Sequence, residues 1–296
     1  GLYISHVFIP PTPGPVLVAT MLNVELGWVI LVGILCGTVA MIVAGPVFGA
    51  FCGKKYNIAI PEHVASQADF DESKLPSFGT IVGIIMIPLV LIILDSLAGV
   101  IPAMAPLSGV LGFLGEPFVA LLIATVVAMY LLGTRHGYSN EELEKVMTKS
   151  LEPTGLILLV TASGGVLRYM LQYSGLGEVI GNAVASAALP MVVVAFIVAA
   201  LVRISVGSAT VAMTMAAGIV AAMPGIAELS PLYLACVTAA VAGGATVCSH
   251  FNDSGFWLVK SLIGMDEKTT LKTWTIMETL VGGTGFLVAL IISFFA

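Results

Sequence analysis

Long apolar segments are the feature of this sequence that most restricts its fold. Residues 28–51, 79–101, 117–133 and 273–296 are almost uninterrupted apolar runs, and a helix needs about 20 such residues to cross the hydrocarbon core of a bilayer. Hydrophobic residues make up 58% of the chain and charged residues 9%, against roughly 25% charged residues in a soluble domain. We therefore predict an all-α, polytopic membrane protein.

Three breaks interrupt the other apolar segments. In the first segment, residues 1–22, four prolines and a glycine fall within positions 10–15, which a helix cannot accommodate. The stretch 190–222 is broken at 206–210, and the stretch 231–263 at 249–255. At membrane depth, unwound backbone is tolerated only where it is buried in protein or lines a watery cavity. The breaks therefore predict a solute pathway formed by broken transmembrane helices.

Basic residues indicate the orientation. Nine of the eleven Lys and Arg residues lie in the segments 52–78, 134–152 and 260–272, whereas 102–116, 175–189 and 223–230 contain none. Because cytoplasmic loops are rich in Lys and Arg, we place the three basic segments in the cytoplasm.

This orientation predicts the course of the remaining segments. Residues 154–174, with Arg168 near one end, would cross outward, and 231–263 would cross inward. Residues 190–222 must then form a re-entrant hairpin, because each arm of about 14 residues is too short to span. In an alternative topology, 154–174 is the hairpin and 190–222 is the crossing, and the charge count does not exclude it.

The first and third breaks resemble each other. Both open with a Ser-His pair, Ser5-His6 and Ser249-His250, and each precedes a Trp at the head of the next span. The predicted topology inverts these two units, and inverted repeats with discontinuous helices are typical of secondary transporters. We assign 1–51 to the end of a first repeat, 52–78 to a cytoplasmic loop and 79–296 to a second repeat. Because the apolar sequence starts at Gly1 without a charged leader, we expect an N-terminal part to be missing.

The breaks carry the candidate site residues. A polar or charged solute on this pathway needs fixed partners in place of water, and the breaks offer the positive charge of Arg203, helix N-termini and nearby hydroxyl and amide groups. The predicted substrate-binding residues are Arg203, Ser208, Thr210, Asn252, Ser254 and Thr12, and the predicted proton-coupling residues are Asp253, His250 and His6. In the alternative interpretation, the hydroxyls bond to their own helices and His250 only fixes the break. Asp95 and Glu278, inside apolar spans, are weaker candidates.

Other functions are disfavoured. The cysteines form no CxxC pair, so we expect no metal site, and the few basic residues give no nucleic-acid footprint. Ser208, His250 and Asp253 have the residue types of a hydrolase triad, but a GxSxG elbow is absent around Ser208. We therefore expect no enzyme activity and no cofactor. A channel fits the paired breaks less well than alternating access does.

Motifs at all three breaks give the chain a family resemblance. They are Ser5-His6-Val7-Phe8-Ile9-Pro10-Pro11-Thr12-Pro13-Gly14-Pro15, Arg203 with Gly207-Ser208-Ala209-Thr210-Val211-Ala212, and Ser249-His250-Phe251-Asn252-Asp253-Ser254-Gly255-Phe256-Trp257. With these motifs, and with Lys272-Thr273-Trp274 and Glu278-Thr279, the chain resembles the gluconate permeases, which are gluconate:proton symporters of the ion-transporter superfamily.

The resemblance implies a function. It implies import of gluconate or a related small hydroxy-acid anion by proton symport, with Na⁺ as the alternative coupling ion. It also implies a multi-pass location in the inner (plasma) membrane and a homodimer. Whole members of the family carry an additional N-terminal portion with a first hairpin.

Overall fold

The computed structural model describes residues 2–56, 75–151 and 189–296, with a few isolated positions between 152 and 188. All regular elements in these residues are helices, which confirms the predicted all-α class. The predicted span 154–174, including Arg168, lies largely outside the described residues. Contacts divide the chain into two compact units, residues 70–159 and the remainder. This division does not follow the predicted repeats, which stay a prediction.

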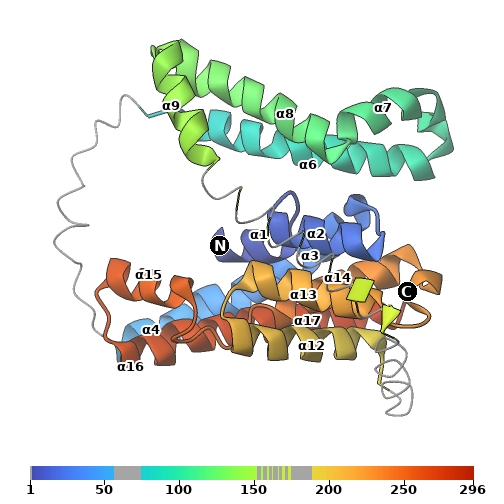
Figure 1. The fold of residues 1–296 in the computed structure, drawn as a ribbon. Coiled ribbons are helices and arrows are strands. Elements are labelled where there is room, and N and C mark those ends of the chain that lie inside the picture. The colour runs from blue at the N-terminus through green and yellow to red at the C-terminus, as the bar shows by residue number, and fades with distance from the viewer. Residues whose placement is uncertain are drawn as a thin grey trace. The chain divides into compact units, whose positions relative to one another are not determined.

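The larger unit is a bundle of helices (Figure 1). Its helices are α1 Leu2–Phe8, α2 Pro13–Leu22, α3 Leu26–Ile42, α4 Phe48–Lys55, α12 Met191–Val206, α13 Ala209–Ala221, α14 Pro231–Gly244, α15 Ser254–Ile263, α16 Glu267–Thr270 and α17 Ile276–Ser293. The π-helical turns η1 (Val43–Val47) and η7 (Leu271–Thr275) make α3–α4 and α16–α17 continuous, and the 3₁₀ turn η6 (Ile226–Glu228) precedes α14. The resulting rods, Leu26–Lys55 and Glu267–Ser293, are long and apolar enough to cross a membrane, as predicted for 28–51 and 273–296.

The central helix of this unit is α14, which packs against α2, α3, α12 and α17. It is buried from Leu234 to Gly244, and most of its residues are small. A side chain at Gly243 would collide with the backbone of Gly282 in α17, and one at Gly244 with the backbone of Phe196 in α12. Small residues let membrane helices approach this closely. The break at the end of α14 therefore starts inside the core.

Two parts of the larger unit share one layout. In each, a helix ends in a break, a ten-residue half-helix follows (α2 or α15), and a residue of left-handed conformation leads into a long helix. The N-caps Thr12 and Asp253, the left-handed residues Asn23 and Gly264, and the helix starts Leu26 and Glu267 are each separated by 241 residues. The Ser-His pairs do not follow this register, because Ser5-His6 lies inside α1 whereas Ser249-His250 lies in the break after α14. The sequence-based alignment of the two parts was therefore displaced by a few residues.

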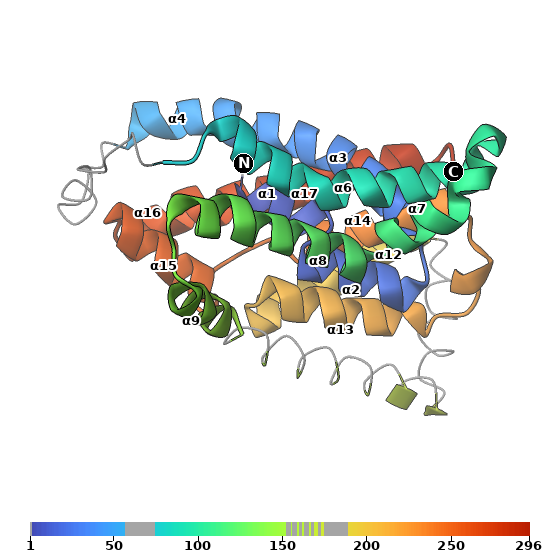
Figure 2. The same cartoon turned by 90° about the horizontal axis from the view of Figure 1, so that it is seen from above.

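The two parts run in opposite directions. In Figures 1 and 2, α3 runs toward α4, whereas α17 starts beside α16 at that same end and runs back. The helices α3 and α17 pack against each other. Lys54 and Lys55 in α4 lie at this end, together with Lys260 in α15, which matches the basic side defined from the sequence.

The stretch 190–222 forms two helices joined by a sharp turn. Gly207 is left-handed (φ 85°), and Ser208 caps α13 by accepting a hydrogen bond from the Val211 N–H. The arms α12 and α13 have 16 and 13 residues, about 24 Å and 20 Å long, which is shorter than a bilayer core of about 30 Å. The predicted hairpin is therefore present as a helical pair, and its re-entry into a membrane stays a prediction.

The smaller unit contains two long apolar helices. It consists of α6 Phe78–Val100, the 3₁₀ helix η3 Pro102–Leu107, α7 Ser108–Gly115, α8 Pro117–Ala128, the π-helical η4 Met129–Gly133, the 3₁₀ turn η5 Thr134–His136 and the polar α9 Asn140–Ser150. Phe78–Asp95 and Pro117–His136 are each able to span a membrane by length and composition, in agreement with the predicted spans 79–101 and 117–133.

Candidate functional site

The tip of the α12–α13 hairpin meets the break between α14 and α15. The amide of Asn252 donates to the carbonyl of Ile204 at 2.8 Å, and Nε2 of His250 lies 3.1 Å from the same oxygen. The last carbonyls of a helix lack partners within the helix, so the two side chains complete the end of α12. A side chain on Gly207 would collide with the carbonyl of Asn252, so the backbones also touch.

A buried ion pair lies directly behind this contact. Arg203 in α12 is 1% exposed, and its Nη2 lies 2.5 Å from Oδ2 of Asp253. Asp253 also accepts hydrogen bonds from the Ser249 hydroxyl (2.5 Å) and from the Gly255 N–H (2.9 Å), the latter as the N-cap of α15. A buried charge pair is tolerated when its remaining hydrogen-bonding groups are satisfied. These bonds fix the carboxylate of Asp253 toward Arg203.

The hydrogen-bond network extends to the helix that follows the break. The indole Nε1 of Trp274 donates to the Ser249 hydroxyl at 2.9 Å, and the Thr275 hydroxyl donates to the Ser249 carbonyl. Tyr3 in α1 packs edge-on against Trp274, with ring centroids 5.5 Å apart. The network therefore connects α12, the break, η7 and α1.

Glu278 is a second carboxylate beside Arg203. Its side chain is 0% exposed, and Oε2 lies 3.9 Å from Nη2 of Arg203. Among the described residues, Nε and Nη1 of Arg203 have no hydrogen-bond partner. The Tyr3 hydroxyl lies within hydrogen-bonding range of the carboxyl group of Glu278. The sequence offered one signal for this residue, an acid inside an apolar span, but gave no reason to place it next to Arg203.

The predicted site residues fall into two groups in the structure. Arg203, Asp253, His250 and Asn252 come together as described, with Ser208 and Thr210 half-buried at the start of α13 and Ser254 exposed at the start of α15. Thr12 caps α2 in the first break, where its hydroxyl donates to the Ile9 carbonyl at 2.8 Å. His6 lies in α1 rather than in that break, 6.1 Å from the ring of Tyr3. No structural feature tests the roles predicted for these residues.

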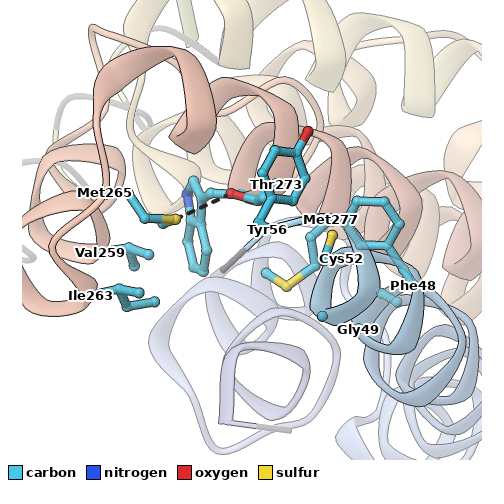
Figure 3. Close-up of a pocket in the computed structure, with 12 residues that line it drawn as sticks. Phe48, Gly49, Cys52, Tyr56, Val259, Ile263, Met265, Thr273 and Met277 are labelled. Atoms are coloured by element: carbon cyan, nitrogen blue, oxygen red, sulfur yellow. Dashed lines mark hydrogen bonds between the residues drawn. The ribbon is translucent and has the colours of Figure 1, made fainter. Parts of the chain in front are cut away.

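A cavity of about 250 Å³ has Trp274 among its lining residues, and Figure 3 shows most of the others. Figure 3 shows Phe48 and Cys52 of α4 facing Val259 and Ile263 of α15, with Thr273 and Met277 along the rod that ends in α17. Most of these side chains are apolar, so the cavity does not suit a polyhydroxy acid. It lies between α4 and α15, at the basic end of the unit.

Long apolar helices, a broken helix and a helical hairpin that share a buried ion pair form an all-α membrane architecture of the kind that is typical of secondary transporters. The family model described as GntP family permease matches residues 1–295. The chain therefore belongs to the GntP permease family, as the sequence motifs predicted.

Individual relatives agree with this assignment. The chain is 40% identical over 294 residues to the low-affinity gluconate transporter of Escherichia coli K12, covering 98% of this chain and 65% of that protein. It is 34% identical over 298 residues to a gluconate permease of Pseudomonas aeruginosa, covering 99% and 65%. It is also 34% identical over 294 residues to the Gnt-II system L-idonate transporter of E. coli K12, covering 99% and 66%. No solved structure matches. The chain thus spans about two thirds of the length of these relatives.

Proposed function

We propose that this chain belongs to a secondary active transporter that imports gluconate or a related small hydroxy-acid anion through the inner membrane by proton symport. The observation that carries the proposal is the buried Arg203–Asp253 pair at the meeting point of the hairpin tip and the broken helix. The names of the relatives, gluconate and L-idonate transporters, support the substrate class.

The depth of the ion pair supports a transport pathway. Glu278, next to Arg203, lies 11 residues from the start of the rod Glu267–Ser293 and 15 from its end, which is about 16 Å and 22 Å along the axis. The site thus sits near the middle of a helix that can span the bilayer. Ionisable groups at such depth are costly and usually serve function. We place the hairpin as re-entrant from the side opposite the basic end.

The chemistry of the site suits a hydroxy-acid anion. Arg203 supplies a positive charge, and its Nε and Nη1, which have no hydrogen-bond partner among the described residues, are where a substrate carboxylate binds in the proposal. The start of α13 presents Ser208 and Thr210, and the start of α15 presents Ser254 beside Asn252. Helix N-termini favour anions. In the proposal, these side chains, with Thr12 from the first break, bind the substrate hydroxyls.

Coupling to protons is part of the proposal. The candidates from the sequence are Asp253, His250 and His6. A Na⁺-coupled carboxylate symporter is the alternative, because the carbonyls of the breaks and the hydroxyls beside them are oxygen ligands. In both cases, we expect a homodimer in the plasma membrane.

Uptake of labelled gluconate tests the proposal. The complete coding sequence is expressed in cells that lack their own gluconate transporters, and unlabelled sugar acids compete with the label. We expect gluconate or a close relative to compete best, uptake to stop with a protonophore, and uptake to continue without Na⁺. Uptake that follows the Na⁺ gradient would establish the alternative, and no saturable uptake of any hydroxy acid would refute the substrate class.

A further inference from the structure

One cation faces two carboxylates at the centre of the larger unit. The same nitrogen of Arg203, Nη2, is 2.5 Å from Asp253 and 3.9 Å from Glu278. Asp253 accepts three hydrogen bonds, from Arg203, Ser249 and Gly255. Among the described residues, Glu278 has the Tyr3 hydroxyl as its hydrogen-bonding neighbour and receives no bond from a backbone or cationic donor. A single positive charge balances only one of the two acids, and a second unpaired charge in an apolar interior is costly.

We propose that Glu278 is the proton-binding residue of the transporter and that Arg203 is the cation through which proton and substrate binding are linked. This inference rests on the proposed function and assigns the coupling step to a residue. With Glu278 protonated, the group Arg203–Asp253–Glu278 is neutral. An incoming carboxylate then adds one negative charge to the site, whereas with Glu278 ionised it would bring the total to two. Anion binding therefore favours the protonated acid, and protonation favours anion binding to the same extent.

The surroundings of Glu278 contain few other groups that can exchange a proton. Tyr3 from α1, Arg203 from α12 and Asp253 from the break are its electrostatic neighbours. The packed helices α3 and α14 contribute the thiols of Cys36 and Cys236, which lie near Ala289, about three helical turns further along α17. Glu278 is thus the acid of this cluster that no cationic or backbone donor holds by a hydrogen bond among the described residues.

In the proposal, the proton leaves Glu278 toward a cavity that lies along the same helix. Trp274 lies one turn before Glu278, on the same face of the helix, and lines the cavity between α4 and α15. That cavity is at the basic, cytoplasmic end in the predicted orientation. In this scheme, the proton passes from the carboxyl group of Glu278 past Trp274 to water in the cavity, and Glu278 is left as a carboxylate when the substrate has been released.

The experiment compares the complete wild-type protein with Glu278→Gln, because glutamine has the shape of the protonated acid but cannot release a proton. Gluconate affinity is measured by calorimetry at pH 6 and pH 8. We expect wild-type affinity to fall by about tenfold per pH unit once Glu278 ionises, and the affinity of the variant to be independent of pH. In proteoliposomes whose outside is one pH unit more acidic than the inside, the wild type should accumulate gluconate about tenfold. Glu278→Gln should exchange labelled for unlabelled gluconate but accumulate none.

Glu228→Gln provides the matched control, because Glu228 is exposed in the turn η6 before α14, and it should behave as wild type. A Glu278→Gln protein that still accumulates gluconate in the acid gradient would overturn the assignment while leaving the transporter in place. Loss of gluconate exchange in Glu278→Gln would also overturn it, since the neutral side chain should suffice for binding. A wild-type protein that binds no gluconate would instead refute the proposed function.

Discussion

Asp253 caps α15 and at the same time pairs with Arg203 of α12, a residue 50 positions earlier, at 2.5 Å. One carboxylate thus sets the start of the half-helix and fixes it to the hairpin arm. If the hairpin moves relative to the broken helix, this ion pair must either separate or move with one of them. The pair therefore links the two elements that alternating access would move.

Removal of the cation should destabilise the fold more than removal of the whole pair. Arg203→Met leaves Asp253 buried without its partner, which costs about 3–5 kcal/mol. The double variant Arg203→Met/Asp253→Asn removes that unpaired charge and should recover a large part of the lost free energy of unfolding. Thermal unfolding of the purified proteins in detergent measures both. A double variant that unfolds at or below the temperature of Arg203→Met would show that the pair does not act as a unit.

The contact between hairpin tip and break depends on Gly207. Gly207→Ala should strongly destabilise the fold, because φ is 85° and the new methyl group would collide with the carbonyl of Asn252. Gly225→Ala is the matched control, since Gly225 also has positive φ (78°) but no atom within 4 Å of its added Cβ. The control should lose about 1–2 kcal/mol from backbone strain alone, and Gly207→Ala clearly more, together with gluconate uptake. Equal losses of stability would contradict the close contact.

The amide of Asn252 should act as a donor to the end of α12. Asn252→Ala removes the hydrogen bond to the Ile204 carbonyl, which is worth about 1 kcal/mol. Asn252→Asp, although closer in shape, places a carboxylate against carbonyl oxygens and should unfold at a lower temperature than Asn252→Ala. The reverse order of melting temperatures would show that donation to Ile204 is not what Asn252 contributes.

In the smaller unit, the start of α9 should respond to acid. Ser139 and Glu142 form a reciprocal capping box, and hydrogen bonds from Ser139 hold the pKa of Glu142 below its ordinary value of 4.5. Because the pKa is lower in the folded state, the stabilisation is present above pH 4.5 and is lost as the pH falls through the folded-state value. Hydrogen exchange of the first-turn amides of α9 should therefore be slow at pH 6. At lower pH, their exchange rate should increase relative to that of an unstructured amide at the same pH. Glu142→Gln should show the weaker dependence on pH, and identical profiles for the two proteins would contradict the capping box.

The spans and breaks could be predicted from sequence because each depends on local composition. Four prolines and a glycine near Thr12 and the polar run around Asp253 break helices wherever they occur, and the structure places N-caps at both residues. Arg203 and Asp253 were both selected as site residues for separate roles. Their pairing joins positions 50 residues apart, and no local pattern contains that information.

The alignment of the two parts of the larger unit also depends on information that no local sequence pattern contains. Ser5-His6 and Ser249-His250 are similar in letters, but the first pair lies in a helix and the second in a break. Equivalent positions of the two parts are defined by the backbone geometry of the helix N-caps, in which Thr12 corresponds to Asp253. The sequence indicates Glu278 only weakly for a related reason, since its complete burial arises from α17 packing against α14, α3 and α12.

In the proposed transporter, the hairpin tip and the break line the path of the substrate. Thiol labelling of a single cysteine at Thr210, in the complete protein with Cys36, Cys52, Cys236 and Cys248 replaced, tests it most directly. We predict that a water-soluble reagent labels Thr210→Cys and that gluconate, but not glucose, slows the labelling severalfold. A cysteine at Thr148, exposed on α9, should be labelled at the same rate with or without gluconate. Labelling at position 210 that gluconate leaves unchanged, in a protein that still transports gluconate, would contradict the claim.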